Sequence, residues 1–100
     1  MIIEFNGEIW FWHGPAPFYF VTVPDDESRD LKAISGFVTY GWGMIPCEVV
    51  IGKTHYKTSL WPKDNGYILP IKAAVRMAEG IEIGDTVKAK ISIDEFAAFK

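Results

Sequence analysis

The chain has 100 residues, of which 49% are hydrophobic and 23% are charged, a balance that excludes disordered, collagen-like and coiled-coil chains. This length is sufficient for one packed domain and too short for two, so we expect a single domain over residues 1–100. The formal net charge is −3, from 10 Lys and Arg against 13 Asp and Glu. This acidic balance argues against a protein built mainly to hold nucleic-acid phosphates.

Three features bear on the compartment. The apolar stretch 9–23 is broken by Gly14, Pro15 and Pro17 and is shorter than the roughly 20 residues of a membrane-spanning helix. The opening Met-Ile-Ile-Glu lacks the basic segment of a signal peptide. The chain has one cysteine, which cannot form an internal disulfide and so favours a reducing compartment. We expect a cytoplasmic protein that does not associate with membranes.

Hydrophobic patterning predicts three strands and a helix in the first part of the chain. Alternation places Ile9 and Phe11 on the buried face of the first strand, where Gly7 marks a bulge or bend. Pro24, followed by three acidic residues, is typical of a helix start. The predicted elements are a strand over 3–12, a strand over 18–23, a helix from 24 to about 33 that ends at 35–36, and a strand over 37–40.

The rest of the chain predicts a hairpin, a short strand, a second helix and a last strand. Gly52-Lys53 suits a two-residue turn with glycine first. Pro70 opens the second helix and Gly80 ends it. In that helix the predicted apolar stripe comprises Ile71, Ala74, Val75 and Ala78. The other predicted elements are strands over 45–51 and 54–60, a loop over 61–66, a strand over 67–69, and a strand over 86–93 with Val87, Ala89, Ile91 and Ile93 inward.

Six or seven short strands with only two short helices are typical of a small closed barrel. A parallel α/β sheet would need a crossover helix between most of its strands. We therefore predict a mainly β protein that folds as a closed six- to seven-stranded β-barrel.

Several motifs along the chain resemble those of one family. They are Tyr40 to Pro46, Ile51-Gly52, Thr58-Ser59-Leu60, Pro62-Lys63-Asp64, residues 69–76, Glu79-Gly80-Ile81 and Gly84-Asp85-Thr86-Val87. Over essentially its whole length the chain is similar to the bacterial and archaeal domain-of-unknown-function family numbered nineteen-oh-five. This resemblance implies a small closed β-barrel with a relation to double-psi barrels. It implies no established activity, cofactor or catalytic residue.

A second, weaker resemblance concerns residues 69–87, which are similar to half of the swapped-hairpin barrels of AbrB-type transcription factors. Positive charge for DNA would come from Lys72, Arg76, Lys88 and Lys90. The first fifty residues oppose this with seven acidic and two basic side chains. DNA binding is therefore the least favoured alternative.

The sequence carries none of the common catalytic motifs. It lacks a Gly-x-Ser-x-Gly elbow, a phosphate loop, a His-Glu-x-x-His segment and a pair of cysteines. Apart from carboxylates, its metal ligands are His13, Cys47 and His55, which do not have metal-binding spacing. We expect a non-enzymatic protein without a metal or a cofactor.

Basic residues gather around the start of the second predicted helix. Lys72 lies in its first turn, Arg76 lies one turn further on, and Lys63 comes from the loop before it. A helix start without acidic residues and with lysine beside it can hold an anion. The simpler interpretation is structural pairing of Lys72 and Arg76 with Asp64, Glu79 or Asp85.

The tryptophans form the second group of candidate residues. Trp10 and Trp12 share the outer face of the first strand, whereas Trp42 and Trp61 lie in predicted loops. Large aromatic side chains outside a core cover a barrel end, stack on a ligand or meet a partner. The simpler interpretation is that at least two of the four plug the ends of the barrel.

We predict that aromatic and basic side chains together form a site for a flat anionic ligand or a carboxylate-bearing peptide. Its candidate residues are Trp42, Trp61, Lys63, Lys72 and Arg76. The alternative is a protein-interaction or self-associating domain that uses Trp10 and Trp12.

Overall fold

The structure is a computed structural model that describes residues 1–14, 18–38 and 43–94. Its elements are β1 (Ile2–Trp12), β2 (Phe18–Thr22), α1 (Asp25–Val38), β3 (Ile45–Ile51), β4 (Thr54–Lys63), β5 (Gly66–Pro70), α2 (Ala73–Glu79) and β6 (Thr86–Ser92). The strands close into a barrel in the order β1-β2-β5-β4-β3-β6, and each described neighbouring pair is antiparallel. The predicted mainly β closed barrel is confirmed, and the relation to double-psi barrels remains an expectation.

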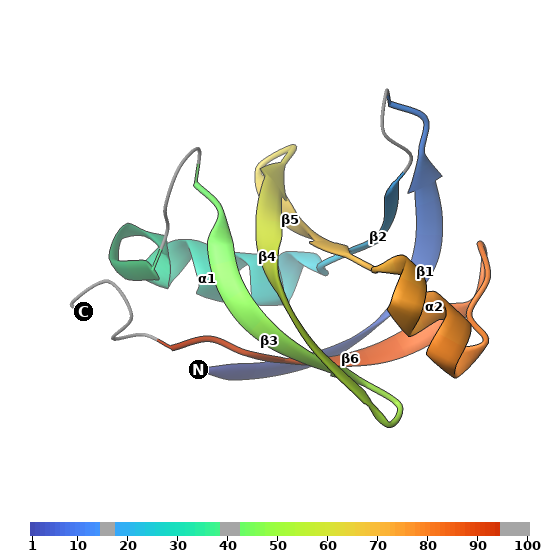
Figure 1. Ribbon diagram of the computed structural model, residues 1–100. Helices are drawn as coiled ribbons and strands as arrows, with labels where there is room; N and C mark the ends of the chain where they lie inside the picture. Colours follow the sequence, from blue (N-terminus) through green and yellow to red (C-terminus); the bar gives the residue numbers. More distant parts are fainter. Residues whose placement is uncertain (15–17, 39–42, 95–100) are drawn as a thin grey trace.

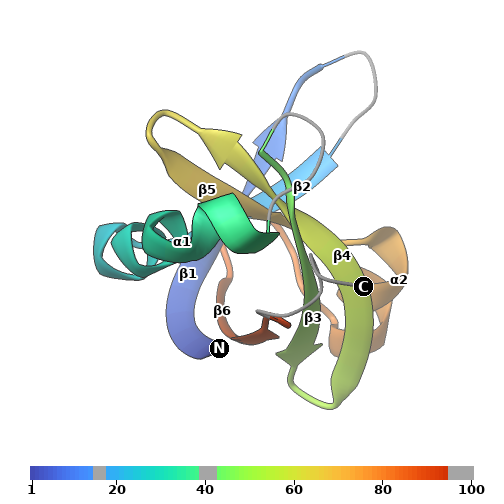
Figure 2. The same ribbon diagram turned by 90° about the vertical axis from the view of Figure 1, so that its left-hand side faces the viewer.

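The two helices lie at opposite ends of the barrel (Figures 1 and 2). Helix α1 packs against β5 and β3, and α2 packs against β4. The β1–β2 and β4–β5 hairpins project from the same side of the barrel (Figure 1). In the described part of the chain, neither helix is long and apolar enough to span a membrane.

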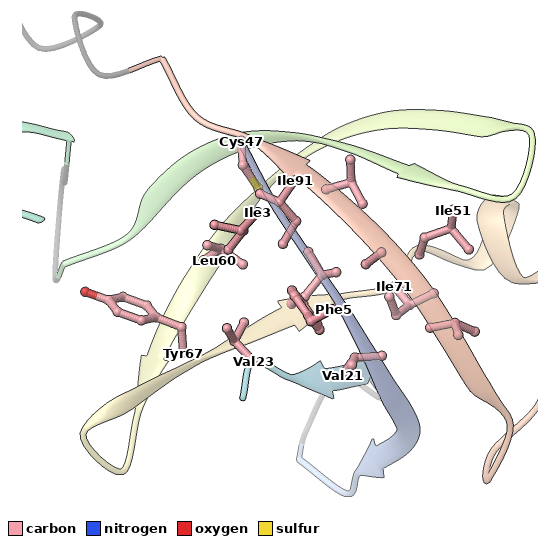
Figure 3. Packing of buried hydrophobic residues seen from close by; sticks show 14 of the residues in the cluster. Ile3, Phe5, Val21, Val23, Cys47, Ile51, Leu60, Tyr67, Ile71 and Ile91 are labelled. Carbon is pink, nitrogen blue, oxygen red and sulfur yellow. The ribbon is translucent and has the colours of Figure 1, made fainter. Parts of the chain in front are cut away.

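Alternate residues of the strands fill the interior of the barrel. Figure 3 shows Phe5 from β1, Leu60 from β4 and Ile91 from β6 pointing into this interior. The predicted inward sides of β1 and β6 are confirmed by the buried residues Ile3, Phe5, Ile9, Val87, Ala89, Ile91 and Ile93. The exception is Phe11, which was predicted to be inward but is only half-buried and lies outside the interior cluster. The alternate residues on the other side of β3 and β6 are mostly exposed, whereas β5 is buried on both sides from Tyr67 to Pro70.

The bulge or bend predicted at Gly7 falls where β1 changes its pairing partner. Residues Ile2–Glu8 pair with β6, whereas Ile9–Trp12 pair with β2. A Cβ atom at Gly7 would overlap with Cγ1 of Val21. Glycine is therefore required here because the backbone of β1 passes directly over a buried side chain.

Two predictions about the first helix are wrong. Helix α1 continues through Gly36 to Val38, so residues 37–38 are helical and not part of a strand, while 39–40 lie outside the described residues. The Ser35 hydroxyl donates to the carbonyl oxygen of Lys32 within the helix. This local bond satisfies the hydroxyl without ending the helix, and an internal glycine costs only about 1 kcal/mol.

The predicted loop 61–66 is also wrong, because β4 continues to Lys63. The connection to β5 is the two-residue turn Asp64-Asn65, whose φ angles are 50° and 66°. Asp and Asn tolerate this left-handed conformation better than most residues, and two such residues in succession suit a tight hairpin turn. Consequently Trp61, Pro62 and Lys63 are held on a strand.

The second helix is shorter than predicted. Pro70 is the last residue of β5, and α2 begins at Ala73 with Lys72 at its N-cap, while Gly80 ends it in the left-handed conformation as predicted. In the predicted apolar stripe, Ile71 and Val75 are buried, but Ala74 and Ala78 are exposed. A two-turn helix on the barrel surface therefore anchors itself through a single buried residue, Val75.

Candidate functional site

The outer face of strands β1, β2 and β4 carries a group of aromatic side chains. Trp10 pairs with Phe20 across the β1–β2 hairpin, and Trp12 pairs with Phe18. Trp61 reaches the same group, with ring centroids 5.1 Å from Phe20 and 5.4 Å from Phe18. We call these five residues the aromatic face.

Phe20 forms the floor of the aromatic face. It follows the pattern of an outward residue, because its neighbour Val21 belongs to the interior cluster and successive side chains point to opposite sides. Nevertheless Phe20 is only 1% exposed. Trp10 at 5.2 Å and Trp61 at 5.1 Å, measured between ring centroids, cover it. The outer aromatic residues therefore form a small second core.

The edge of the aromatic face remains open to solvent. Trp12 is 40% exposed and stacks on Phe18. The indole Nε1 of Trp10 donates to the hydroxyl of Thr22 at 3.0 Å, which fixes the orientation of that ring. The alternative in which at least two tryptophans plug the barrel ends does not fit, because Trp10, Trp12 and Trp61 all lie outside the interior cluster.

Two hollows adjoin Trp61. The small hollow has a volume of about 190 Å³, and the large hollow has a volume of about 380 Å³. Trp10, Trp12, Phe20, Trp61, Pro62, Lys63 and Ile68 line the small hollow. Phe18, Tyr19, Thr58, Trp61, Pro70, Ile71, Lys72, Ala73 and Arg76 line the large one. Both are mostly apolar, and both include cationic side chains.

A further hollow of about 440 Å³ lies beside Cys47 and Glu48, on another part of the surface. Its described lining contains no aromatic residue. Its basic residue, Lys57, lies 3.7 Å from the carboxylate of Glu48. A ligand site combines apolar walls with a few polar groups free to bind, so the hollows beside Trp61 are the stronger candidates despite their smaller volumes.

Lys72 and Arg76 carry the positive charge of the large hollow. The guanidinium carbon of Arg76 lies 3.5 Å from the centroid of the Tyr19 ring. Nζ of Lys72 lies 6.0 Å from the centroid of the Tyr56 ring. Among the described residues no carboxylate pairs with either cation, and Nε of Arg76 is buried without a hydrogen-bond acceptor. Buried polar groups normally have a partner.

The expected pairing of these cations with nearby carboxylates is wrong, because each carboxylate has another partner. Asp64 pairs with Lys63 at 3.6 Å. Glu79 accepts a hydrogen bond of 2.6 Å from the Thr54 hydroxyl and faces the β3–β4 turn. The third candidate, Asp85, accepts a hydrogen bond of 2.8 Å from the backbone N–H of Glu82. The charges of Lys72 and Arg76 therefore remain available to a ligand.

The two surfaces predicted from the sequence meet at Trp61. Of the predicted ligand site, the large hollow unites Trp61, Lys72 and Arg76. Lys63 lines the small hollow instead, together with the predicted interaction residues Trp10 and Trp12. Trp42 lies outside the described residues.

Comparison with known proteins places the chain in a family. The family model described as Domain of unknown function (DUF1905) matches residues 5–91. The chain belongs to this family. The match includes part or all of every strand of the barrel and all described residues of both hollows. No curated protein matches the chain.

Three aromatic residues of the DUF1905 barrel's candidate site were missed by sequence reasoning. Phe18 and Tyr19 line the large hollow, and Phe20 is the floor of the aromatic face. A hairpin between the first two predicted strands would place alternate residues of 18–22 opposite Trp10 and Trp12, so the sequence indicated that some aromatic residues of the second strand lie beside the tryptophans. Which of them do so depends on the register of the hairpin, which the sequence does not show.

Cys47 lies away from the aromatic face, inside the DUF1905 barrel. Burial raises the pKa of its thiol to about 12, and a backbone hydrogen bond with Leu60 opposes the rise only in part. In the described part of the chain, no three His, Cys, Asp or Glu side chains gather as a metal site would require. The thiol is therefore neutral at physiological pH and packs as a small apolar group.

We expect Cys47 in the folded protein to resist alkylation by iodoacetamide at pH 8 and to react rapidly in concentrated urea. The reagent attacks the thiolate, which burial disfavours. The same shift lowers stability at alkaline pH, because above about pH 9 the unfolded chain releases this proton while the folded chain retains it up to about pH 12. Labelling followed by mass spectrometry measures the first effect. Equal rates with and without urea would contradict it.

Proposed function

We propose that this domain is a non-enzymatic binding module for a carboxylate-bearing ligand, either a flat small molecule or a peptide. The observation that carries the proposal is the large hollow, where Lys72 and Arg76 lack carboxylate partners among the described residues. Hydrogen bonds between such cations and a carboxylate are about twice as strong as neutral ones. The aromatic walls supply a stacking surface for the rest of the ligand.

The lining of both hollows supports binding rather than catalysis. Their described residues include no His, Asp, Glu or Cys. These are the side chains that most often act as general acids, general bases or activated nucleophiles. The chemistry that predominates in both hollows, cations and aromatic rings, is suited to recognising and orienting a ligand through charge and stacking.

A reducing cytoplasm is the compartment that we propose for this binding. The chain's single cysteine, Cys47, is buried and is free rather than disulfide-bonded. A free thiol of this kind persists most readily where disulfides do not form.

Benzoate is expected to stabilise the protein, whereas the isosteric neutral compound benzamide is not. At about 100 times its dissociation constant, a ligand that binds only the folded state adds roughly 2.7 kcal/mol, which raises the unfolding midpoint by several degrees. The measurement is a thermal unfolding series over ligand concentration. Potassium chloride at equal ionic strength controls for a general salt effect.

Lys72→Ala and Lys88→Ala form a matched pair for this experiment. Both lysines are exposed, and each substitution removes one positive charge. Lys88, however, lies on β6 away from the large hollow and pairs with Glu4. We expect Lys72→Ala to weaken benzoate binding by about ten-fold, the loss of one charge-assisted hydrogen bond. Lys88→Ala should leave it unchanged. Equal effects of the two variants, or stabilisation by benzamide equal to that by benzoate, would refute the proposed site.

A further inference from the structure

We propose that the ligand of this surface is an extended, proline-containing peptide segment with an acidic residue next to its prolines. This inference rests on the proposed function and names the ligand class for the same site. The prolines would occupy the small hollow, and the acidic side chain would reach the large one.

The arrangement of the two hollows favours a chain over a compact molecule. Trp61 lines both hollows, so the two adjoin at this residue. A flat ligand the size of one ring system fills one hollow and leaves the other empty. An extended peptide that crosses Trp61 occupies both, with one side chain in each.

The walls of the small hollow favour proline. Its lining is formed largely by Trp10, Trp12, Phe20, Trp61 and the ring of Pro62. Proline-rich segments dock in aromatic-lined grooves, because their polyproline II conformation is already formed and loses little entropy on binding. The volume of about 190 Å³ fits side chains the size of one or two proline rings better than a larger ring system.

Trp61 also offers a hydrogen-bond donor to such a peptide. The indole Nε1 of Trp10 is already bonded to Thr22. In contrast, the indole N–H of Trp61 has no hydrogen-bond acceptor within residues 1–14, 18–38 and 43–94. A polyproline II segment has no internal hydrogen bonds, so its carbonyl groups are free to accept. A peptide lying across Trp61 brings a carbonyl group to this donor.

The basic side chains that line the two hollows favour a peptide with an acidic residue next to its prolines. Lys72 and Arg76 line the large hollow, and Lys63 lies at the small one. No acidic residue lines either hollow among the described residues. A basic peptide would therefore meet like charge at Lys72 and Arg76, whereas an aspartate or glutamate gains two cationic partners there.

Blocked decapeptides of four compositions, eight peptides in all, test the inference by fluorescence anisotropy. Each carries either four consecutive prolines or four alanines, followed by either two glutamates or two glutamines, and each is also made with the two blocks in reverse order. We expect the proline–glutamate peptide, in one order, to bind about ten-fold or more tightly than each of the other three compositions.

Two protein variants separate the contributions. Trp12→Ala removes an exposed wall of the small hollow and is expected to abolish the preference for proline over alanine while keeping the preference for glutamate over glutamine. Lys72→Ala is expected to abolish the preference for glutamate over glutamine while leaving the proline preference intact. Each variant serves as the folded control for the other.

The outcomes distinguish this inference from the proposed function. If both glutamate peptides bind equally and the glutamine peptides do not, the anion site stands and the proline inference is overturned. Failure of all eight peptides while benzoate binds overturns the peptide ligand alone. If neither the peptides nor benzoate bind, the proposed function fails as well.

Discussion

Replacing Gly7 by alanine is expected to lower the free energy of unfolding by about 1–3 kcal/mol, the range for inserting atoms into a packed core. The added Cβ would overlap with Cγ1 of Val21, which is 0% exposed and has no room to move. The conflict falls where β1 leaves β6 and pairs with β2. Urea unfolding followed by circular dichroism measures the loss.

Two controls make the test of Gly7 specific. A Cβ at Gly36 in α1 meets nothing within 4 Å, so Gly36→Ala should raise stability by about 0.5–1 kcal/mol. Val21→Ala should relieve the overlap, so the double variant with Gly7→Ala should be more stable than the sum of the two single changes predicts. Additive effects of the two changes would show that Gly7 is not held by this contact.

Phe20→Ala is expected to lower the free energy of unfolding by about 3–5 kcal/mol, the cost of removing a buried aromatic ring. This is an unusual cost for a residue on the outer face of a barrel, where substitutions usually change stability by less than about 0.5 kcal/mol. It arises because Trp10, Phe18 and Trp61 bury the ring.

Phe20→Leu separates the volume of the ring from its aromatic contacts. Because most of the buried volume remains, we expect a loss of only about 1 kcal/mol. Thermal or urea unfolding of both variants gives the comparison. A loss below about 0.5 kcal/mol for Phe20→Ala would mean that the aromatic face does not form a packed layer in solution.

The sequence predicted the barrel well where a strand has one buried and one solvated face. In β6, strict alternation allows only one choice of inward side, and Ala89 and Ile91 are fully buried as predicted. Gly7 and the Gly52-Lys53 turn were also predictable from the sequence. Gly7 leaves room for a close approach of the backbone to Val21, and Gly52 adopts the positive φ of a tight turn.

The ends of elements were less predictable, because they depend on small local energies. Ser35-Gly36 ends many helices, yet here α1 passes through it, since one hydroxyl bonded to Lys32 and a glycine cost of about 1 kcal/mol are easily outweighed. Asp64-Asn65 was predicted as part of a loop over 61–66, although Asp and Asn tolerate the left-handed conformation that a tight hairpin turn needs.

The sequence indicated most of the residues of the candidate site but not which of them lie side by side. Trp61, Lys72 and Arg76 lie together as expected, but the union with Trp10 and Trp12 depends on the strand order β1-β2-β5-β4. That order joins segments about fifty residues apart, which local patterns do not encode.

The expected ion pairs failed for a related reason. Arg76 and Glu79 are three residues apart on α2, a spacing that favours pairing on an isolated helix. In the folded chain Glu79 turns to the β3–β4 turn and binds Thr54 instead. A tertiary partner outside the helix therefore decides whether Arg76 remains available.

The most direct test of the ligand site is a two-dimensional ¹H–¹⁵N NMR titration of the labelled protein with benzoate. We expect saturable shifts confined to the indole N–H of Trp61 and to the backbone amides of Tyr19, Lys72 and Arg76, which line or adjoin the large hollow. Benzamide should produce none of them. Shifts that centre instead on the hollow beside Cys47 and Glu48, or no saturable shift at all, would contradict the site proposed at Trp61.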